Sequence, residues 1–229
     1  MTDPGAQGAL IYFRAQGFRH GSIPVAVPAV ERVLQVHGWS VSSTDDLETF
    51  RQSLGQTRVV IFLLTSGDIL DDSARARLKT FVEGGGGFVG VHSATVTELD
   101  WPWYLELAGA YFKGHPEGTA EGRVEVLDPA HPATRHLPQV FTRREEWYSF
   151  DRQPTALAGT RVVLGVDEES YGPPSSLRMG THPVAWHREV GQGRAFQTAL
   201  GHSAESYVDP AFLEHVAGAV DWAGRRSHE

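Results

Sequence analysis

The stretch FVEGGGGFVGVHSA, residues 81–94, decides the fold that the sequence predicts. A helical pattern runs into four glycines, and Gly84 and Gly85 suit a helix end because glycine adopts the left-handed conformation at low cost. The apolar run 87–91 is too short for a helix, so it predicts a buried strand. His92 follows that strand at its carboxyl end, which is where open α/β sheets bind their ligands.

Strand and helix patterns alternate through the first half of the chain. Short runs at residues 9–13, 39–43 and 58–64 predict strands, and the last run is apolar from Val59 to Leu64, as in strands that are buried on both faces. A helical pattern follows each run, and Asp71 is placed to cap one of these helices. Four strands that are each followed by a helix predict an α/β fold with a flavodoxin-like, doubly wound, mostly parallel sheet.

Prolines and capping residues set the predicted helix boundaries. Pro28 lies inside the first helical pattern, so this helix is predicted to start either at Ser22 or close to Pro28 itself. Asp100 and Gly109 predict the two ends of a short helix, and Asp209 opens the last one.

The second half predicts a β-hairpin region within the same domain. Residues 183–187 and 194–200 flank a glycine-containing turn, which is the pattern of a hairpin. A chain of 229 residues is long enough for one sizeable core, so we expect a single domain over residues 1–229 with frayed ends at 1–8 and 224–229. Further strands are predicted at residues 122–127, 140–150 and 161–166.

Composition excludes several classes of function. The formal net charge is −8 and basic residues form no run, so nucleic acids and anionic membranes are not expected partners. No apolar stretch approaches the roughly 20 residues that cross a bilayer, and no leader pattern is present, so we expect a soluble, cytoplasmic protein. The chain has no cysteine, which excludes disulfides, thiolate metal sites and a cysteine nucleophile. It has 11 histidines, which carry chemistry near neutral pH.

Two segments of the chain repeat one pattern, a β-prone run followed by a His-Ser pair. The first ends in His92-Ser93 and the second in His202-Ser203. If both strands are parallel members of one sheet, both histidines lie at the same edge. His20, in the long loop after the first predicted strand, belongs to that edge too.

Several ordered motifs resemble those of the trehalose-utilisation (ThuA-like) family, which has the class I glutamine-amidotransferase-like, flavodoxin-related fold. The resemblance covers most of the chain. It is carried by GFRHGSIP at 17–24, GGGFVGVHSA at 85–94, GAYFKGH at 109–115, His131-Pro132, EWY at 146–148, PVAW at 183–186, Gly193-Arg194 and LGHS at 200–203.

The resemblance implies a site and excludes one activity. By this resemblance His92 stands where the wider superfamily has its cysteine nucleophile, His202 matches the superfamily's histidine, and Glu205 is a weaker match to its glutamate. Without the thiol, glutamine-amide hydrolysis through a thioester cannot proceed. The resemblance implies instead a role in the metabolism of a disaccharide or an oxidised keto-sugar.

The candidate residues suit acid-base chemistry on such a sugar. Enolisation, isomerisation or elimination beside a carbonyl needs a base, an acid and a group that polarises the oxygen. We expect His92, His202 and Glu146 to supply these catalytic roles. The expected substrate-binding residues are His20, Ser93, His115, Tyr148 and Trp186.

A metal site is the alternative use of the same residues. Neutral imidazoles of His20, His92 and His202, or two of them with Glu146, could hold Zn²⁺ or another divalent ion with an open position for a sugar oxygen. The sequence contains no HxxxH or HxH spacing, so only the whole constellation predicts this site.

Other functions remain open at the level of sequence. A non-catalytic carbohydrate-binding or accessory protein would keep the same cleft, and a serine hydrolase would need Ser93 or Ser203 in contact with a histidine. The aromatic residues of segment 101–112 suit either a sugar platform or a core or homodimer contact. Of the pair Glu145 and Glu146, we expect one to face inward, and the resemblance favours Glu146.

The remaining histidines are expected to have structural roles or none. Histidines are more often hydrogen-bonded surface or core residues than catalysts, and we expect this of His37, His136, His187, His215 and His228. His131 and His182 each precede a proline, so they mark either turns or sites.

Overall fold

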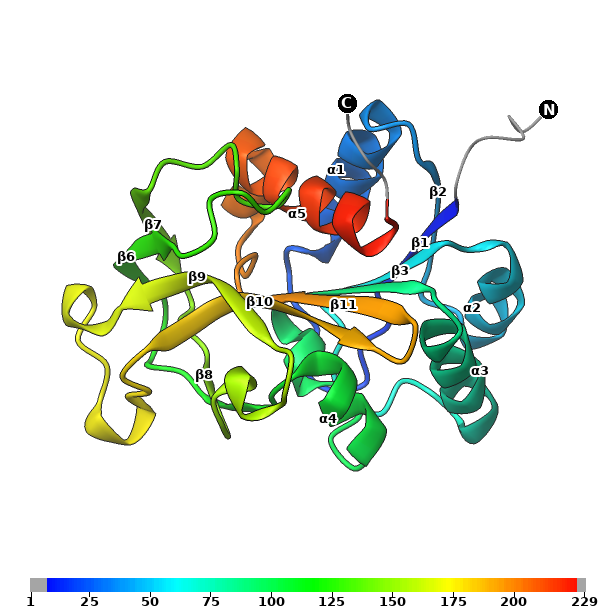
Figure 1. The fold of residues 1–229 in the computed structure, drawn as a ribbon, viewed down its shortest axis with the longest axis horizontal. Helices are drawn as coiled ribbons and strands as arrows, with labels where there is room; N and C mark the ends of the chain where they lie inside the picture. The colour runs from blue at the N-terminus through cyan, green and yellow to red at the C-terminus, as the bar shows by residue number, and fades with distance from the viewer. Residues whose placement is uncertain (1–7, 226–229) are drawn as a thin grey trace.

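The computed structural model describes residues 8–225 and contains a sheet of nine strands in the order β2-β1-β3-β4-β11-β10-β9-β6-β7. Figure 1 shows this sheet running from β2 on the right to β7 on the left. The first five strands are parallel, and the other four alternate in direction. A two-stranded sheet of β5 and β8 lies apart from it. The predicted α/β fold with a mostly parallel, flavodoxin-like half is confirmed.

The alternation that the sequence predicts for its first half is present in the structure. β3 and β4 are buried along their whole length, as expected of central parallel strands. The bounds in this half are β1 Gly8–Tyr12, α1 Ile23–Val36, β2 Ser40–Thr44, α2 Leu47–Ser53, β3 Val59–Leu63, α3 Asp72–Glu83, β4 Gly87–Val91 and α4 Pro102–Ala108.

The second half extends the sheet with antiparallel strands. The predicted hairpin is formed by β10 and β11, and β11 also pairs in parallel with β4, so the hairpin joins the two halves of the sheet. The bounds are β5 Phe112–Gly114, β6 Ala120–Val126, β7 Val140–Glu145, β8 Ser149–Phe150, β9 Arg161–Asp167, β10 His182–Val190, β11 Gly193–Thr198 and α5 Pro210–Ala223.

Helices cover both faces of the parallel half. Figure 1 shows α1 and α5 above the sheet and α3 and α4 below it. The upper layer buries residues such as Val30 and Val220 against the sheet, and the lower layer buries Phe50, Leu78 and Tyr104. Within residues 8–225, no helix has both the length and the apolar character needed to cross a membrane.

The glycine stretch behaves as predicted. α3 ends at Glu83, and Gly85 has φ +111°, which favours glycine. Gly90, inside β4, leaves no room for a side chain, because a Cβ there would lie 1.9 Å from the Oε1 atom of Gln197. The chain therefore leaves this stretch as a straight, fully buried strand that ends next to His92.

The structure confirms the predicted start of α1 next to Ser22 and corrects two predicted side-chain caps. α1 begins at Ile23 and continues through Pro28, because its apolar face packs on the sheet and offsets the hydrogen bond that proline removes. Ser22 does not cap this helix; its hydroxyl donates to the carbonyl of His202 instead, at 2.8 Å. Asp100 does not cap α4, whose first flanking residue is Trp101. Asp71 and Asp209 do cap α3 and α5, as predicted.

The structure describes only the inner residues of the two segments that are predicted to fray. Gly8 is the first residue of β1, and Gly224 donates to the carbonyl of Val220 at the end of α5. The rest of the two predicted frayed segments, residues 1–7 and 226–229, lies outside the described residues.

The aromatic segment 101–112 divides between core and pocket. Tyr104 is fully buried in the lower core layer and Trp103 is 8% exposed, so both pack rather than bind. Phe112, in contrast, packs at a tilt against Tyr148 with ring centroids 4.4 Å apart, at the cavity described below.

Candidate functional site

Parallel strand pairing brings the candidate histidines to one edge of the sheet. Val91 and Thr198, the last residues of β4 and β11, are partners in register. His92 follows the first of these strands directly and His202 follows the second after a short turn. His20 comes from the loop after β1, which is parallel to both. The expectation that these three residues meet at the carboxyl edge is met by the geometry.

His92 is fixed in position by its backbone and by its ring. Its φ is +52°, a sparsely populated conformation for a residue with a side chain, and such conformations gather at functional sites. The side chain is fully buried, and Nδ1 lies 2.8 Å from the carbonyl oxygen of Ala199. Because a carbonyl only accepts, Nδ1 carries the proton and Nε2 is left with a lone pair.

Three atoms form a tight triangle at this lone pair. Glu146 Oε2 lies 3.4 Å from His92 Nε2 and 3.1 Å from His202 Nδ1. The two imidazole nitrogens are 3.3 Å apart. Without a cation, the proton of His202 Nδ1 is shared between a carboxylate oxygen and the His92 lone pair. His20 offers a fourth ligand atom, and the four atoms all lie within 4.8 Å of one another.

The charges of the cluster follow from these contacts. Burial works against ionisation of Glu146, but the interactions with His202 and then with His92 outweigh it and hold the pKa of the carboxyl well below its ordinary value. The hydrogen bond to Glu146 raises the pKa of His202 despite its partial burial. Burial, reinforced by the neighbouring histidines, lowers the pKa of His20 to about 3. Glu146 is therefore anionic and His20 neutral at pH 7.

The donor set fits a divalent metal ion. Tetrahedral Zn²⁺ with ligands at 2.0–2.2 Å places its ligand atoms about 3.3–3.6 Å apart, close to the edges of this triangle. The bond from His92 Nδ1 to a backbone carbonyl is the support that metal-binding histidines usually have, and it directs Nε2 to the ion. The cluster His20, His92, Glu146 and His202 could thus bind a metal.

A cavity of ≈ 380 Å³ opens beside the cluster. His115 stands at its mouth, with Nε2 3.4 Å from the second carboxylate oxygen of Glu146. The Tyr148 ring packs against His92 with centroids 4.3 Å apart. The lining residues are Phe18, His20, Ser66, Ser93, Val96, Phe112, His115, Glu146 and Tyr148.

Most predicted site residues meet here, and two do not. Trp186 is buried in the core, where its indole donates to the carbonyl of Ala108 at 2.8 Å, so it does not reach the cavity. Glu205 is exposed, and the carboxylate at the cluster is Glu146. Ser93 lies at the cavity with Oγ 3.4 Å from His20 Nδ1, at the long limit of a hydrogen bond. The lowered pKa of His20 makes it a poor base for a serine nucleophile.

Glu145 holds the loop that carries His202, and the sequence argument did not select it. It is 1% exposed, and its carboxylate accepts from the backbone amides of Gly201, at 3.0 Å, and His202, at 3.2 Å. Ser206 and Arg143 donate to the same carboxylate at 3.1 and 3.0 Å. The pair of adjacent glutamates was the available signal: β7 ends at Glu145, so strict alternation stops there and both carboxylates turn inward.

Phe18 is a second residue that the sequence argument did not select. It lines the cavity, its ring lies edge-on to His20 with centroids 4.9 Å apart, and yet it is 71% exposed. An exposed aromatic ring at the mouth of a polar site is a common contact for a sugar face or another flat apolar surface.

Other histidines have structural partners. His37 contacts the carboxylates of Asp221 and Glu214 at 2.8 and 3.1 Å. His182, one of the two undecided residues, lies between Glu168 and the carbonyl of Tyr148, at 2.9 and 2.8 Å, and so supports the cavity wall from behind. The ring of His136 contacts the carbonyl of Ala211 at 2.9 Å. His228 lies outside the described residues.

Comparison with known proteins places this geometry in a family. The family model ThuA, described as trehalose utilisation, matches residues 8–223. A ThuA-like protein from Bacteroides uniformis has a TM-score of 0.79 at 21% identity over 97% of this chain and 94% of its own. A ThuA-like protein from Parabacteroides merdae has a TM-score of 0.74 at 17% identity over 98% and 92%.

One structure that bears another name shares the fold over part of its length. A β-galactosidase from Bacillus circulans sp. alkalophilus gives a TM-score of 0.59 at 15% identity over 95% of this chain but only 31% of its own. Likeness at such identities shows the fold alone. A search of curated proteins finds no match.

Proposed function

This chain belongs to the ThuA family of trehalose utilisation, and from that premise we propose that it is an enzyme that acts on a disaccharide or keto-sugar with the cluster of His92, His202 and Glu146. The family points to sugar metabolism. It does not name a reaction, so the reaction class is inferred from the chemistry of the residues. The absence of any thiol argues against glutamine amidotransferase activity.

The observation that carries the proposal is the triangle of His92 Nε2, His202 Nδ1 and Glu146 Oε2, with edges of 3.1–3.4 Å. Two lone-pair acceptors in this triangle share a single proton, which is an unfavourable arrangement for a structural cluster. A cluster with a purely structural role would instead pair each acceptor with its own donor.

We further propose that the triangle binds a divalent ion such as Zn²⁺, with His20 as the fourth ligand. When bound, the ion would polarise a carbonyl or hydroxyl oxygen of the sugar as a Lewis acid. The ring of His92 is fixed from outside the cluster by the carbonyl of Ala199. The carboxylate of Glu145 holds the backbone amide of His202, and Ser93 Oγ lies 3.4 Å from the ring of His20.

The remaining groups suit proton transfer and orientation. Glu146 Oε1 is not part of the triangle and faces His115 Nε2 at 3.4 Å, so the two can pass a proton between the sugar and the cavity mouth. His115 Nδ1 lies 2.7 Å from the carbonyl of Pro116 and therefore donates to it, which directs Nε2 to Glu146. Tyr148 and Phe112 offer ring faces to the apolar side of a sugar.

The test is turnover of a 3-keto disaccharide or 3-keto glucoside by purified protein. We expect His92→Ala and His202→Ala to keep the fold and to lower kcat by about 100- to 10,000-fold, because each removes a group that acts on the reacting atoms. His136→Ala, which changes an exposed histidine, is the matched control and should retain the rate. Wild-type rates in both cluster variants would refute the catalytic proposal.

A metal measurement separates the two parts of the proposal. Elemental analysis of protein purified without chelator should find one divalent ion per chain. Titration of metal-free protein with Zn²⁺ should release protons, because the cation displaces the proton of His202 Nδ1. Turnover by protein that holds no bound ion would support acid-base catalysis and contradict the proposal that a metal takes part.

A second candidate is a carbohydrate-binding protein without catalytic activity. The aromatic and apolar lining formed by Phe18, Phe112 and Tyr148 favours it. Calorimetric titration with the same sugars discriminates between the two. Binding that leaves the sugar chemically unchanged after prolonged incubation would favour the second candidate.

A further inference from the structure

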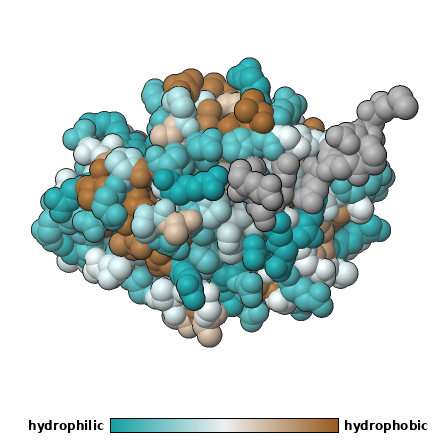
Figure 2. Space-filling model, turned by 45° about the horizontal axis from the view of Figure 1, so that its top comes forward, coloured by the Kyte–Doolittle hydropathy of each residue, from teal (hydrophilic) through white to brown (hydrophobic). Residues whose placement is uncertain are grey.

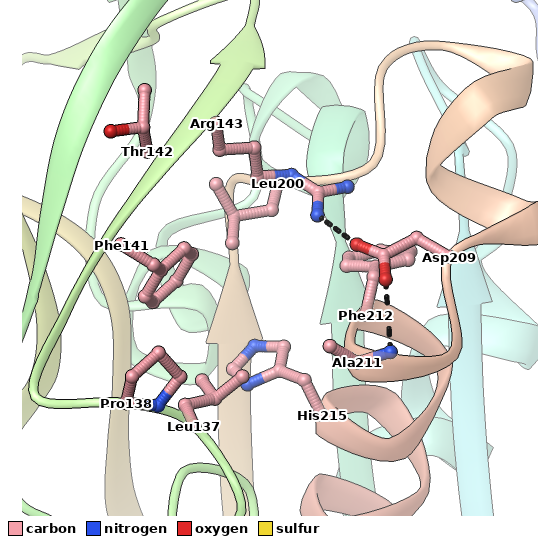
Figure 3. A pocket seen from close by; sticks show the side chains of 10 residues that line it. All are labelled: Leu137, Pro138, Phe141, Thr142, Arg143, Leu200, Asp209, Ala211, Phe212 and His215. Carbon is pink, nitrogen blue, oxygen red and sulfur yellow. Dashed lines mark hydrogen bonds and ion pairs between the residues drawn. The ribbon is translucent and has the colours of Figure 1, made fainter.

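A second pocket lies between α5 and β7, away from the cluster. Its volume is ≈ 280 Å³, which suits a molecule of about one aromatic ring. Figure 3 shows Phe141, Pro138 and Leu137 on one side and Phe212 and Ala211 on the other, with Leu200 above. Figure 2 shows apolar surface at the left of the view, over the region of β6 and β7.

His215 gives this pocket an unsatisfied acceptor. The residue is 1% exposed, and its Nδ1 lies 2.8 Å from the carbonyl oxygen of Ala133, so Nδ1 carries the proton and donates. Nε2 is buried and has no hydrogen-bond partner among the described residues. Figure 3 shows the ring projecting from α5 toward the space between Leu137, Phe141 and Leu200.

The ring of His215 is neutral, so Nε2 accepts. Burial lowers the pKa of His215 to about 4. Buried acceptors without a partner are rare in native proteins, and they are often satisfied by a bound group. The partner that this atom lacks is a hydroxyl or N–H donor.

The charges at the rim are already paired. Arg143 donates to Asp209 at 2.8 Å and to Glu145 at 3.0 Å, and Figure 3 shows the first of these bonds. Asp209 also caps α5 by accepting from Ala211 at 3.0 Å. The pocket therefore offers no unpaired charge to an ionic ligand, and its remaining wall is apolar.

We propose that the pocket between α5 and β7 binds a small, uncharged, largely apolar molecule whose single hydroxyl or N–H group donates to His215 Nε2. Wall side chains cover Nε2, so one of them shifts when the donor reaches it. The site does not depend on the function proposed for the cluster, and its ligand differs in kind from a sugar, which carries many hydroxyls.

The pocket is joined to the cluster through two short paths. Leu200 lines the pocket and is separated from His202 by Gly201 alone. Arg143 also lines it and binds Glu145, which holds the amides of Gly201 and His202. A molecule seated here therefore changes the surroundings of the His202 backbone.

Phenol and toluene are the probes that test the proposal. They have nearly the same shape, and phenol alone has a hydroxyl donor. In ¹H–¹⁵N spectra of the full chain we expect phenol to bind saturably, to shift the amides of 137–143 and 209–215, and to shift those of Gly201 and His202. Phenol should bind about two- to tenfold tighter than toluene, which is the range of one hydrogen bond to a neutral acceptor.

Two variants keep the test decisive. His215→Phe keeps a ring without the acceptor and should abolish the preference for phenol over toluene. Leu137→Trp fills the pocket from its wall and should abolish binding of both probes, which covers the case that His215→Phe does not fold. Equal affinities for the two probes in the wild type, or shifts confined to other segments, would overturn the proposal. If the amide shifts at 137–143 depend on the protein concentration and not on the probe concentration, this face is a contact between copies of the chain. That result would overturn the proposal as well.

Discussion

Residues 8–225 contain two groups of three histidines, and among these described residues one group has the geometry of a reactive site. His20, His92 and His202 meet at the carboxyl edge of the parallel strands. His131, His187 and His215 lie on the α5 side of the sheet, where His131 and His187 stack 4.8 Å apart and His215 packs near Phe196.

Ring orientation and one carboxylate account for the difference. In the first group one nitrogen of each ring and a carboxylate oxygen of Glu146 lie within 4.8 Å of one another, so the ligand atoms converge. In the second group the rings of His131 and His187 are 25° apart and meet by their faces. Glu146 supplies a negative charge to the first group, while burial lowers the pKa of His131 to about 3 and keeps it neutral. Histidine count alone therefore does not make a site.

Glu146→Gln should have the largest effect, a loss of Zn²⁺ affinity, because it removes the negative charge that distinguishes the first group of histidines from the second. Structural zinc sites bind with about 10–16 kcal/mol over four ligands, so the loss of one ligand corresponds to about a 100- to 1,000-fold weaker Kd for Zn²⁺. Chelator competition measures it. Glu205→Gln, which changes an exposed carboxylate on the same loop as His202, is the matched control and should leave the Kd unchanged.

The loss of folding stability in acid should reveal the buried, neutral His215 of the second group. The pKa of His215 is about 4 in the folded protein and about 6.5 when unfolded, so below pH 6.5 the unfolded chain takes up a proton that the folded protein does not. Stability is therefore present above pH 6.5 and is lost as the pH falls toward 4, by on the order of 3 kcal/mol between pH 7 and 4.5 from this residue.

Denaturant unfolding of the wild type and His215→Phe at both pH values measures this loss. The variant should lose less stability on acidification than the wild type, whatever its stability at pH 7. An equal loss in the two proteins would mean that other groups cause the acid sensitivity.

Glu145→Gln should give the smallest of these effects, a modest loss of metal affinity. It tests the residue that holds the loop of His202 and does not itself belong to the cluster. A glutamine keeps the shape, but its amide group donates and therefore opposes one of the amides of Gly201 and His202. Loss of a group that orients a metal ligand typically costs 10- to 100-fold in metal affinity or activity. Zinc titration should show this loss with the fold intact. A Kd equal to that of the wild type would show that the His202 loop is positioned without Glu145.

Sequence by itself determined the alternation of strands and helices, the end of α3 at the glycines, and the placement of His92 and His202 at one edge. These features depend on residues close together in the chain, because strand length, helix caps and strand direction are set locally. The motif resemblance added Glu146, and the geometry places this carboxylate within 3.1–3.4 Å of the two imidazoles.

Only the tertiary structure decided which atoms meet. It placed Trp186 in the core, turned Glu145 inward beside Glu146, and carried α1 through Pro28. Contacts between β4, β7 and the loop after β11 join segments that are 50 to 110 residues apart, and they depend on packing at a scale of about 1 Å. A local pattern holds no information at that distance, so the sequence could assign His187 and His215 to structural roles but left His131 undecided until its packing was seen in three dimensions.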